Sequence, residues 1–209
     1  MESPDVVMWM EMLSGAVAEH CDRLTQLDSA IGDGDHGINM KRGLEAVVSA
    51  LSDDAVRAQP PGKVLTVAGR TLVSTVGGAS GPLWGSFFRA AGRSAGDVPS
   101  LDGATLVTAL AAGVTAVQEL GAAVPGDKTM VDALLPGVEA LRSAQGDGAE
   151  LPQALERAAA AAAEGAHATV PLQARKGRAS YLGERSVGHE DPGAASAALV
   201  FDALARSVT

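Results

Sequence analysis

Residues 13–37 read Leu13-Ser-Gly-Ala-Val17-Ala-Glu-His20-Cys-Asp-Arg-Leu24-Thr-Gln-Leu27-Asp28-Ser-Ala-Ile-Gly-Asp33-Gly-Asp35-His-Gly37, and two patterns meet in this stretch. The first is helical, since apolar or large residues recur every three or four positions, at Leu13, Val17, His20, Leu24 and Leu27. This spacing places them on one face of a helix. The second pattern, which begins at Asp28, alternates carboxylates with glycines and ends the helix.

The helical pattern continues along the whole chain, and no segment alternates apolar with polar residues as a half-buried strand would. Only 3% of the residues are aromatic although 46% are hydrophobic, which is typical of a core of closely packed helices with small side chains. We predict an all-α fold of eight helices in one domain spanning residues 1–209. The expected helices are 4–27, 37–52, 61–76, 80–91, 102–120, 129–145, 151–170 and 193–207.

Eight helices joined by short connections are expected to form an antiparallel up-and-down barrel or bundle. In that topology every second connection lies at the same end. The connections at one end are then residues 28–36, 77–79, 121–128 and 171–192, which contain most of the chain's glycine-rich and charged motifs. The sequence therefore predicts a single functional site at this end, while residues 52–60, 92–101 and 146–150 read as ordinary loops.

The carboxylates Asp28, Asp33 and Asp35 lie within eight residues of one another and are separated by glycines. Crowded carboxylates repel one another unless a cation lies between them. Oxygen ligands favour magnesium or calcium over zinc or copper. The alternative to a metal site is a solvated acidic loop without a bound ion. An EF-hand fits poorly, because no glutamate stands at the required end of the loop.

Glycine-rich turns before predicted helices present free backbone N–H groups to anions. Gly77-Gly78-Ala79-Ser80-Gly81 is such a turn, although it is equally compatible with two helices crossing closely. Gly126-Asp127-Lys128-Thr129 lacks the strand and glycine of a P-loop, so we expect Lys128 to hold its loop by an ion pair with an aspartate. Thr129 and Asp132 have the spacing of a helix-capping pair.

The dense basic cluster of the chain is Arg175, Lys176, Arg178 and Arg185. It reads as a solvated loop, a phosphate clamp or a docking surface for an acidic partner. A guanidinium grips phosphate at two points, so Arg178 is our choice for a nucleotide contact. We find no Ser-His-Asp set, reactive cysteine or acid–base carboxylate pair, so no catalytic side chain is assigned.

Composition excludes several other classes of function. The net charge of −9 argues against a nucleic-acid partner, which requires a basic face. One cysteine excludes an internal disulfide. The acidic first residues do not resemble a secretory signal, and the longest alanine run, 158–163, is too short to span a membrane. We expect a cytoplasmic protein without membrane contacts.

Four motifs in order resemble the nucleotide-binding L subunit of dihydroxyacetone kinase. They are residues 28–40, residues 77–85 (Gly77-Gly-Ala-Ser-Gly-Pro-Leu-Trp-Gly), residues 125–130 (Pro125-Gly-Asp-Lys-Thr-Met) and the segment from Ala174 to Gly193. The resemblance covers essentially the whole chain and implies an eight-helix barrel with a nucleotide site at one end.

The resemblance also implies the ligands of that site. Asp28, Asp33 and Asp35 would hold two Mg²⁺ ions, and the bound nucleotide would be ADP or ATP. The implied nucleotide contacts are His36, Gly37, Ile38, Asn39, Ala79, Ser80, Gly121, Met130, Arg178, Asp191, Pro192 and Gly193. Met130 would lie on the adenine side.

By the same resemblance, the phosphoryl group passes to dihydroxyacetone held on a partner K subunit. A phosphocarrier protein of the phosphotransferase system then rephosphorylates the bound ADP. The sequence does not decide whether the chain forms a homodimer. Two rival functions remain: an ATP-exchanging subunit for another small ketose or for a fatty-acid carrier, and a nucleotide-loaded sensor that binds a transcriptional regulator.

Overall fold

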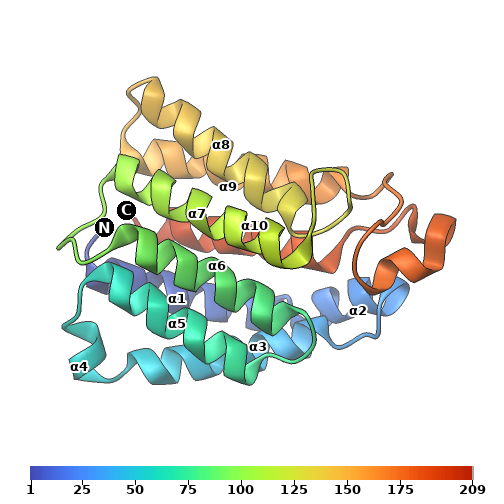
Figure 1. The fold of residues 1–209 in the computed structure, drawn as a ribbon, viewed down its shortest axis with the longest axis horizontal. Helices are drawn as coiled ribbons and strands as arrows, with labels where there is room; N and C mark the ends of the chain where they lie inside the picture. The colour runs from blue at the N-terminus through green and yellow to red at the C-terminus, as the bar shows by residue number, and fades with distance from the viewer. Residues whose placement is uncertain (209) are drawn as a thin grey trace.

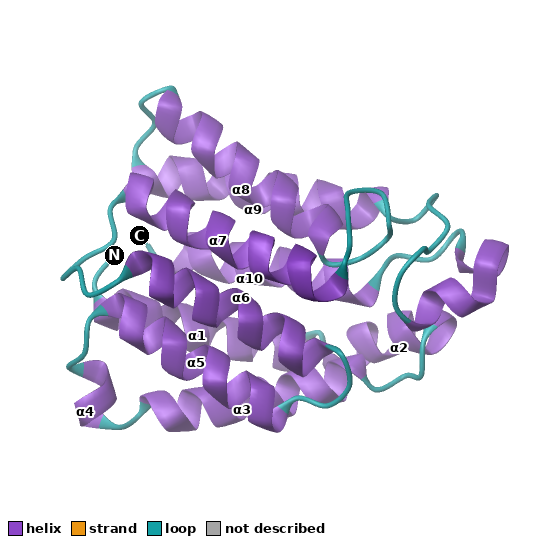
Figure 2. Ribbon diagram, viewed as in Figure 1, coloured by secondary structure: helices purple, strands orange, loops and turns teal. Residues whose placement is uncertain are grey.

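The computed structural model describes residues 1–208, and within this range the secondary structure is entirely helical (Figures 1 and 2). The expected fold class is therefore confirmed. The helices are α1 (Ser3–Glu19), α2 (Cys21–Ile31), α3 (His36–Leu51), α4 (Asp54–Arg57), α5 (Pro61–Thr75), α6 (Ser80–Ala95), α7 (Gly103–Gly121), α8 (Val131–Gly146), α9 (Leu151–Ala168), the 3₁₀ helix η1 (Arg178–Ser186) and α10 (Pro192–Ser207).

The long helices pack in a closed cyclic order. Each of α1, α3, α5, α6, α7, α8, α9 and α10 contacts the next in this order, and α10 returns to α1. Their buried faces merge into one apolar core. At its centre Trp9 meets Phe88 edge-on at 5.6 Å between ring centroids, and Trp84 meets Phe87 at 5.8 Å. These few aromatic residues fill space that Ala, Leu and Val side chains leave between the helices.

Glycines bring α5 and α6 into unusually close contact. A methyl group on Gly69 would lie 2.8 Å from the carbonyl oxygen of Gly85, and one on Gly62 would lie 2.7 Å from that of Gly92. Real Cβ atoms essentially never approach other atoms so closely. Backbone packing against backbone therefore fixes the register of this helix pair, whose connection (residues 76–79) reaches the site.

The predicted first helix, 4–27, is wrong in one respect: it divides at His20 into α1 and α2. Helix α1 belongs to the ring, whereas α2 extends beyond it beside η1 (Figure 1). The apolar spacing continues through the bend without a break, so periodicity alone gives no sign of it. Helix α2 also runs on to Ile31, which places Asp28 in its last turn rather than in a loop.

Two short helices lie where loops were expected. Helix α4 falls within residues 52–60 and begins with Asp53 capping the backbone N–H of Ala55. Helix η1 falls within residues 171–192 and bends at Gly183 (φ +56°). Both are too short to display a helical repeat in the sequence. Helix α6 is also four residues longer than predicted, ending at Ala95.

The two ends of the ring differ in chemistry. Both termini lie at one end, and α2, η1 and the connections before α6, α8 and α10 lie at the other (Figure 1). Among the described residues, α7 alone is long and apolar enough to cross a membrane by length and composition. It packs between α6 and α8 and buries residues such as Leu106, Leu110 and Val114 in the core.

Candidate nucleotide and metal site

The three aspartates come together as the sequence predicted. Asp28, Asp33 and Asp35 each offer an oxygen, and these oxygens all lie within 4.8 Å of one another. Asp28 is 8% exposed, and its Oδ2 accepts hydrogen bonds from the backbone N–H groups of Asp35 (2.9 Å) and His36 (3.1 Å). Asp28 thus folds the loop back on the end of α2 and brings the other two carboxylates beside it.

The glycines of this loop are required by its tight turn. A side chain at Gly32 would meet Oδ1 of Asp28 at 2.0 Å, and Gly34 has φ +74°, which favours glycine. The resulting donor set contains only carboxylate oxygens. Such a set fits Mg²⁺, a hard cation that prefers oxygen ligands.

A single cavity of about 330 Å³ adjoins the carboxylates and is lined from all four predicted connections. The convergence of these connections at one end is therefore confirmed. Of the residues expected at the site, those lining the cavity are Asp28, Asp33, Asp35, His36, Ala79, Ser80, Gly121, Met130, Arg178, Asp191, Pro192 and Gly193. Helices α3, α6 and α10 begin here, and helix N-termini attract anions.

Three predicted contacts do not line the cavity in this structure: Gly37, Ile38 and Asn39. Gly37 faces α2, where an added Cβ would lie 2.1 Å from the carbonyl oxygen of Cys21. Ile38 is 56% exposed, and the amide of Asn39 accepts a hydrogen bond from Arg42 at 2.8 Å. Their assignment to the nucleotide stays a prediction.

Arg178 reaches the carboxylate cluster from η1. Its guanidinium lies 3.1 Å from Oδ2 of Asp33, with the two side chains 67% and 38% exposed. Exposed ion pairs contribute little to stability, about 0–1 kcal/mol. The pair therefore places the Arg178 guanidinium beside the carboxylate cluster without fixing it there.

His36 joins three helices at the wall of the cavity. Its ring nitrogens lie 3.2 Å from Oγ of Ser80 and 3.0 Å from Oγ of Ser196, on α6 and α10. Burial lowers the pKa of His36, although Asp28 and Asp35 act in the opposite direction. The imidazole therefore serves best as a neutral hydrogen-bonding link between helices.

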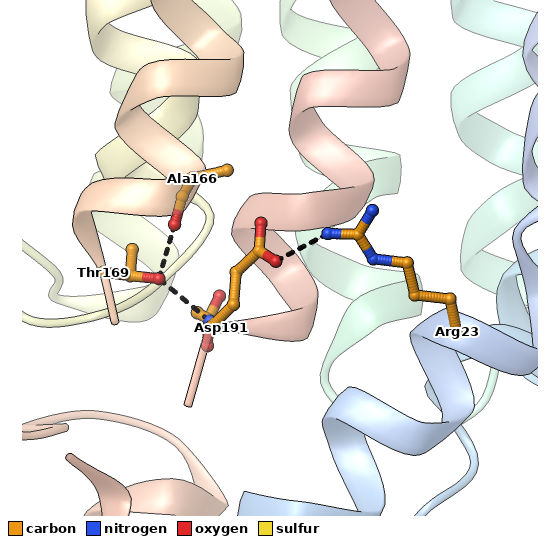
Figure 3. Close-up of polar contacts among 5 residues, drawn as sticks. Arg23, Ala166, Thr169 and Asp191 are labelled. Carbon is orange, nitrogen blue, oxygen red and sulfur yellow. Dashed lines mark hydrogen bonds and ion pairs between the residues drawn. The ribbon is translucent and has the colours of Figure 1, made fainter. Parts of the chain in front are cut away.

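Asp191 caps the start of α10. Its Oδ2 accepts a hydrogen bond from the N–H of Ala194 (2.7 Å). Its own N–H donates to Thr169 Oγ1 (2.9 Å), which donates in turn to the carbonyl of Ala166 (Figure 3). Burial raises the pKa of Asp191 to about 7, with Asp132 and Asp28 adding to the rise and the Ala194 hydrogen bond and Lys128 opposing it.

Sequence reasoning missed one ion pair near the cavity. Arg23 on α2 binds Glu190 at 2.8 Å, and the Glu190 side chain is only 14% exposed (Figure 3). This pair ties the helix that carries Asp28 to the residue before Asp191. No local signal connects positions 167 residues apart.

The predicted ion pair of Lys128 with an aspartate is wrong. Its ammonium donates instead to backbone carbonyls of residues 169–189. The expected contact between Thr129 and Asp132 is present, since the N–H of Thr129 donates to Asp132 (2.8 Å). Thr129 is not the N-cap, however, because α8 begins at Val131 and its N-cap is Met130, which makes no side-chain cap; Thr129 Oγ1 accepts instead from the N–H of Val131 (3.2 Å). Sequence reasoning also missed the apolar wall of the cavity, formed by Ile31, Leu83 and Ala123.

Comparison with known proteins places this site in a family. The model of the DAK2 domain matches residues 30–206. The chain is 44% identical over 200 residues to an Escherichia coli protein named PEP-dependent dihydroxyacetone kinase, ADP-binding subunit DhaL, covering 96% of this chain and 94% of that one. The chain belongs to the DhaL family.

Longer proteins contain a DhaL-like region. An L-erythrulose 1-kinase from Mycolicibacterium smegmatis is 38% identical over 98% of this chain, which spans 36% of that enzyme. The crystal structure of the dihydroxyacetone kinase from C. freundii in complex with AMP-PNP and Mg²⁺ superposes with a TM-score of 0.73. The matched region is 29% identical in sequence. It covers 97% of this chain and 33% of the C. freundii chain.

Proposed function

We propose that this DhaL-family chain is the nucleotide-binding subunit of a phosphoenolpyruvate-dependent dihydroxyacetone kinase. The observation that carries the proposal is the meeting of the three-aspartate cluster with three helix N-termini and Arg178 around one cavity. An ADP or ATP polyphosphate needs both kinds of group, because cations neutralise it and N–H donors orient it. The names of the E. coli relative and of the AMP-PNP and Mg²⁺ complex support the same ligands.

In this proposal Asp28, Asp33 and Asp35 hold two Mg²⁺ ions. Bound magnesium would neutralise phosphate oxygens and favour phosphoryl transfer. The N-termini of α6 and α10, with Ala79, Ser80 and Gly193, orient the polyphosphate. Met130 and Gly121 lie against the base. Arg178 leaves Asp33 for the phosphates, and His36, Gly37, Ile38, Asn39, Asp191 and Pro192 complete the contacts.

The acceptor and its chemistry belong to another chain. Around the cavity His36 is engaged by two serines and Asp191 by a helix terminus, so neither is free as a general base. This supports transfer to dihydroxyacetone on a K subunit, with ADP retained and recharged by a phosphocarrier in the cytoplasm. The M. smegmatis relative favours a second candidate, an ATP-exchanging kinase subunit for a four-carbon ketose.

Mass spectrometry of the native purified protein tests the retained nucleotide, and we expect ADP to co-purify. Reconstitution with a K subunit then separates the candidates. Phosphorylation of dihydroxyacetone that requires phosphoenolpyruvate and phosphocarrier proteins is the expected result. Turnover with free ATP alone, or a preference for erythrulose, would favour the second candidate. Bound ADP without transfer to any ketose would contradict both.

A further inference from the structure

Lys128 is enclosed in a way that its sequence context does not suggest. It is 1% exposed, and its backbone has φ +63°, which is costly for a residue with a side chain. Its Nζ donates to the carbonyls of Thr169 (3.0 Å), Leu172 (3.0 Å) and Ser186 (2.7 Å), with those of Val170 and His189 completing the shell. Five carbonyls thus share three N–H donors.

These carbonyls belong to the two ends of one loop. Residues 169–172 follow α9, and residues 186–189 begin with the last residue of η1; we call these two segments the stem. Within the stem the N–H of Gly188 donates to the carbonyl of Val170 at 2.8 Å. Between them, residues 173–185 form the η1 loop, which carries Arg178 to Asp33. Lys128 therefore lies where the loop closes.

The rest of the η1 loop has few other attachments. Ala174 and Ala179 pack with Ile31 and Leu182 in a small cluster separate from the main core. The Arg178–Asp33 pair is exposed, and Arg175 donates its backbone N–H to the carbonyl of Asp127 at 3.0 Å. The carbonyls of Thr169 and Val170 also accept the backbone N–H groups of Leu172 (3.1 Å) and Gly188 (2.8 Å). Without a cation at the stem, the five carbonyl dipoles would still converge on one buried space with no charge to offset their repulsion.

We propose that Lys128 is a positioning residue whose ammonium acts as a built-in cation, closing the stem and thereby placing Arg178 and Asp191 at the cavity. Rings of backbone carbonyls are also how proteins replace the hydration shell of a free monovalent cation. If the side chain is removed, the cage should therefore accept a free alkylammonium ion. The effect on nucleotide binding rests on the proposed function, whereas closure of the stem does not.

Lys128→Gly tests this, because glycine tolerates φ +63° and n-butylammonium is the missing side chain as a separate ion. The basic residues of the η1 loop make tryptic cleavage within it a measure of loop opening. Without nucleotide, we expect cleavage there to be about tenfold faster in Lys128→Gly than in the native protein, since proteolysis follows the open population. Millimolar n-butylammonium should restore protection, and 1-butanol, which has the shape without the charge, should not.

Lys63→Ala removes an exposed lysine paired with Asp97 at 3.2 Å, and this control should leave cleavage in the loop unchanged. Unchanged cleavage in Lys128→Gly, or equal protection by 1-butanol, would overturn the proposal. If Lys128→Gly does not fold, the comparison is made on refolding: recovery with n-butylammonium alone supports the proposal, and no recovery with either compound overturns it.

Nucleotide affinity, measured in the same samples, separates the two proposals. Mg²⁺-dependent ADP binding that weakens in Lys128→Gly and returns with n-butylammonium supports the positioning role. Normal ADP binding despite an open loop overturns that role. If the native protein binds no ADP, the proposed function is refuted. If n-butylammonium still restores protection of the loop in Lys128→Gly, closure of the stem by Lys128 is supported all the same.

Discussion

At the residue scale, burial beside the cavity makes the ionised form of Asp191 unfavourable. Its carboxylate is buried while it caps α10, and burial raises its pKa from 3.8 to about 7. The folded protein therefore binds this proton more tightly than the unfolded chain does. The sign follows from linkage: between pH 4 and pH 7 the unfolded state holds fewer protons, so the Asp191 contribution lowers stability as pH rises.

Asp191→Asn should remove this dependence, because asparagine also caps helices and carries no charge. In urea unfolding at pH 5 and pH 8, we expect the variant to gain stability relative to the native protein at pH 8. Lys128, Asp132 and Asp28 are the charged groups that act on Asp191, and all remain in the variant. The control Asp202→Asn changes an exposed aspartate beside Arg206. A native-to-variant difference that is the same at both pH values would refute the burial argument.

Residues that act within a few positions of one another were predictable, and those that meet across the fold were not. Asp28, Asp33 and Asp35 form a cluster because one turn joins them, so their spacing already reveals the site. Lys128 finds its carbonyls 41 to 61 residues away. The position of Lys128 next to Asp127 suggested an ion pair with an aspartate. The ammonium instead donates its hydrogen bonds to buried backbone carbonyls.

At the element scale, the contact between α2 and α3 positions Asp28. A methyl group on Gly37 would lie 2.1 Å from the carbonyl of Cys21 and 2.5 Å from Thr25 Oγ1, so the two helices can meet only if residue 37 has no side chain. Gly37→Ala should therefore destabilise the protein by about 1–3 kcal/mol, the usual cost of overpacking.

Gly15→Ala is the matched control for that variant. Gly15 is also helical, but an added Cβ there meets nothing within 4 Å. Alanine should be neutral or stabilise α1 by up to about 1 kcal/mol, because it favours the helix. Thermal and urea unfolding of both variants measure the difference. Equal stability of Gly15→Ala and Gly37→Ala would contradict close packing of α2 on α3.

The long helices were predictable because each buries a stripe with a helical repeat of apolar residues. Seven of the eight expected spans match one structural helix, whereas residues 4–27 form two. The division at His20 is set by where the ring ends, and the stripe runs through it unchanged. Helices α4 and η1 depend on local capping and glycine geometry rather than on a repeat.

At the scale of the whole molecule, the ring of long helices holds the apolar core, and the loops that line the candidate site lie at one end of the ring. Its aromatic and aliphatic core lies between the eight long helices, and the unusual loops are confined to the end away from the termini (Figure 1). A chain of net charge −9 repels a polyphosphate at long range. In the proposed function, magnesium at the three aspartates would resolve this conflict, because it would turn the acidic loop from a repulsive group into a binding site for the polyphosphate.

Calorimetric titration of ADP with and without Mg²⁺, in the native protein and in Asp33→Ala, tests this account most directly. The control Asp22→Ala changes an exposed aspartate in the first turn of the same helix α2. We predict that native and control proteins bind ADP only with Mg²⁺, and that Asp33→Ala weakens binding at least about tenfold, because the loss of even an outer-shell partner of a metal ligand costs about 10- to 100-fold. Binding of ADP by Asp33→Ala with native affinity, or binding by the native protein that is independent of Mg²⁺, would contradict the metal-bridged site.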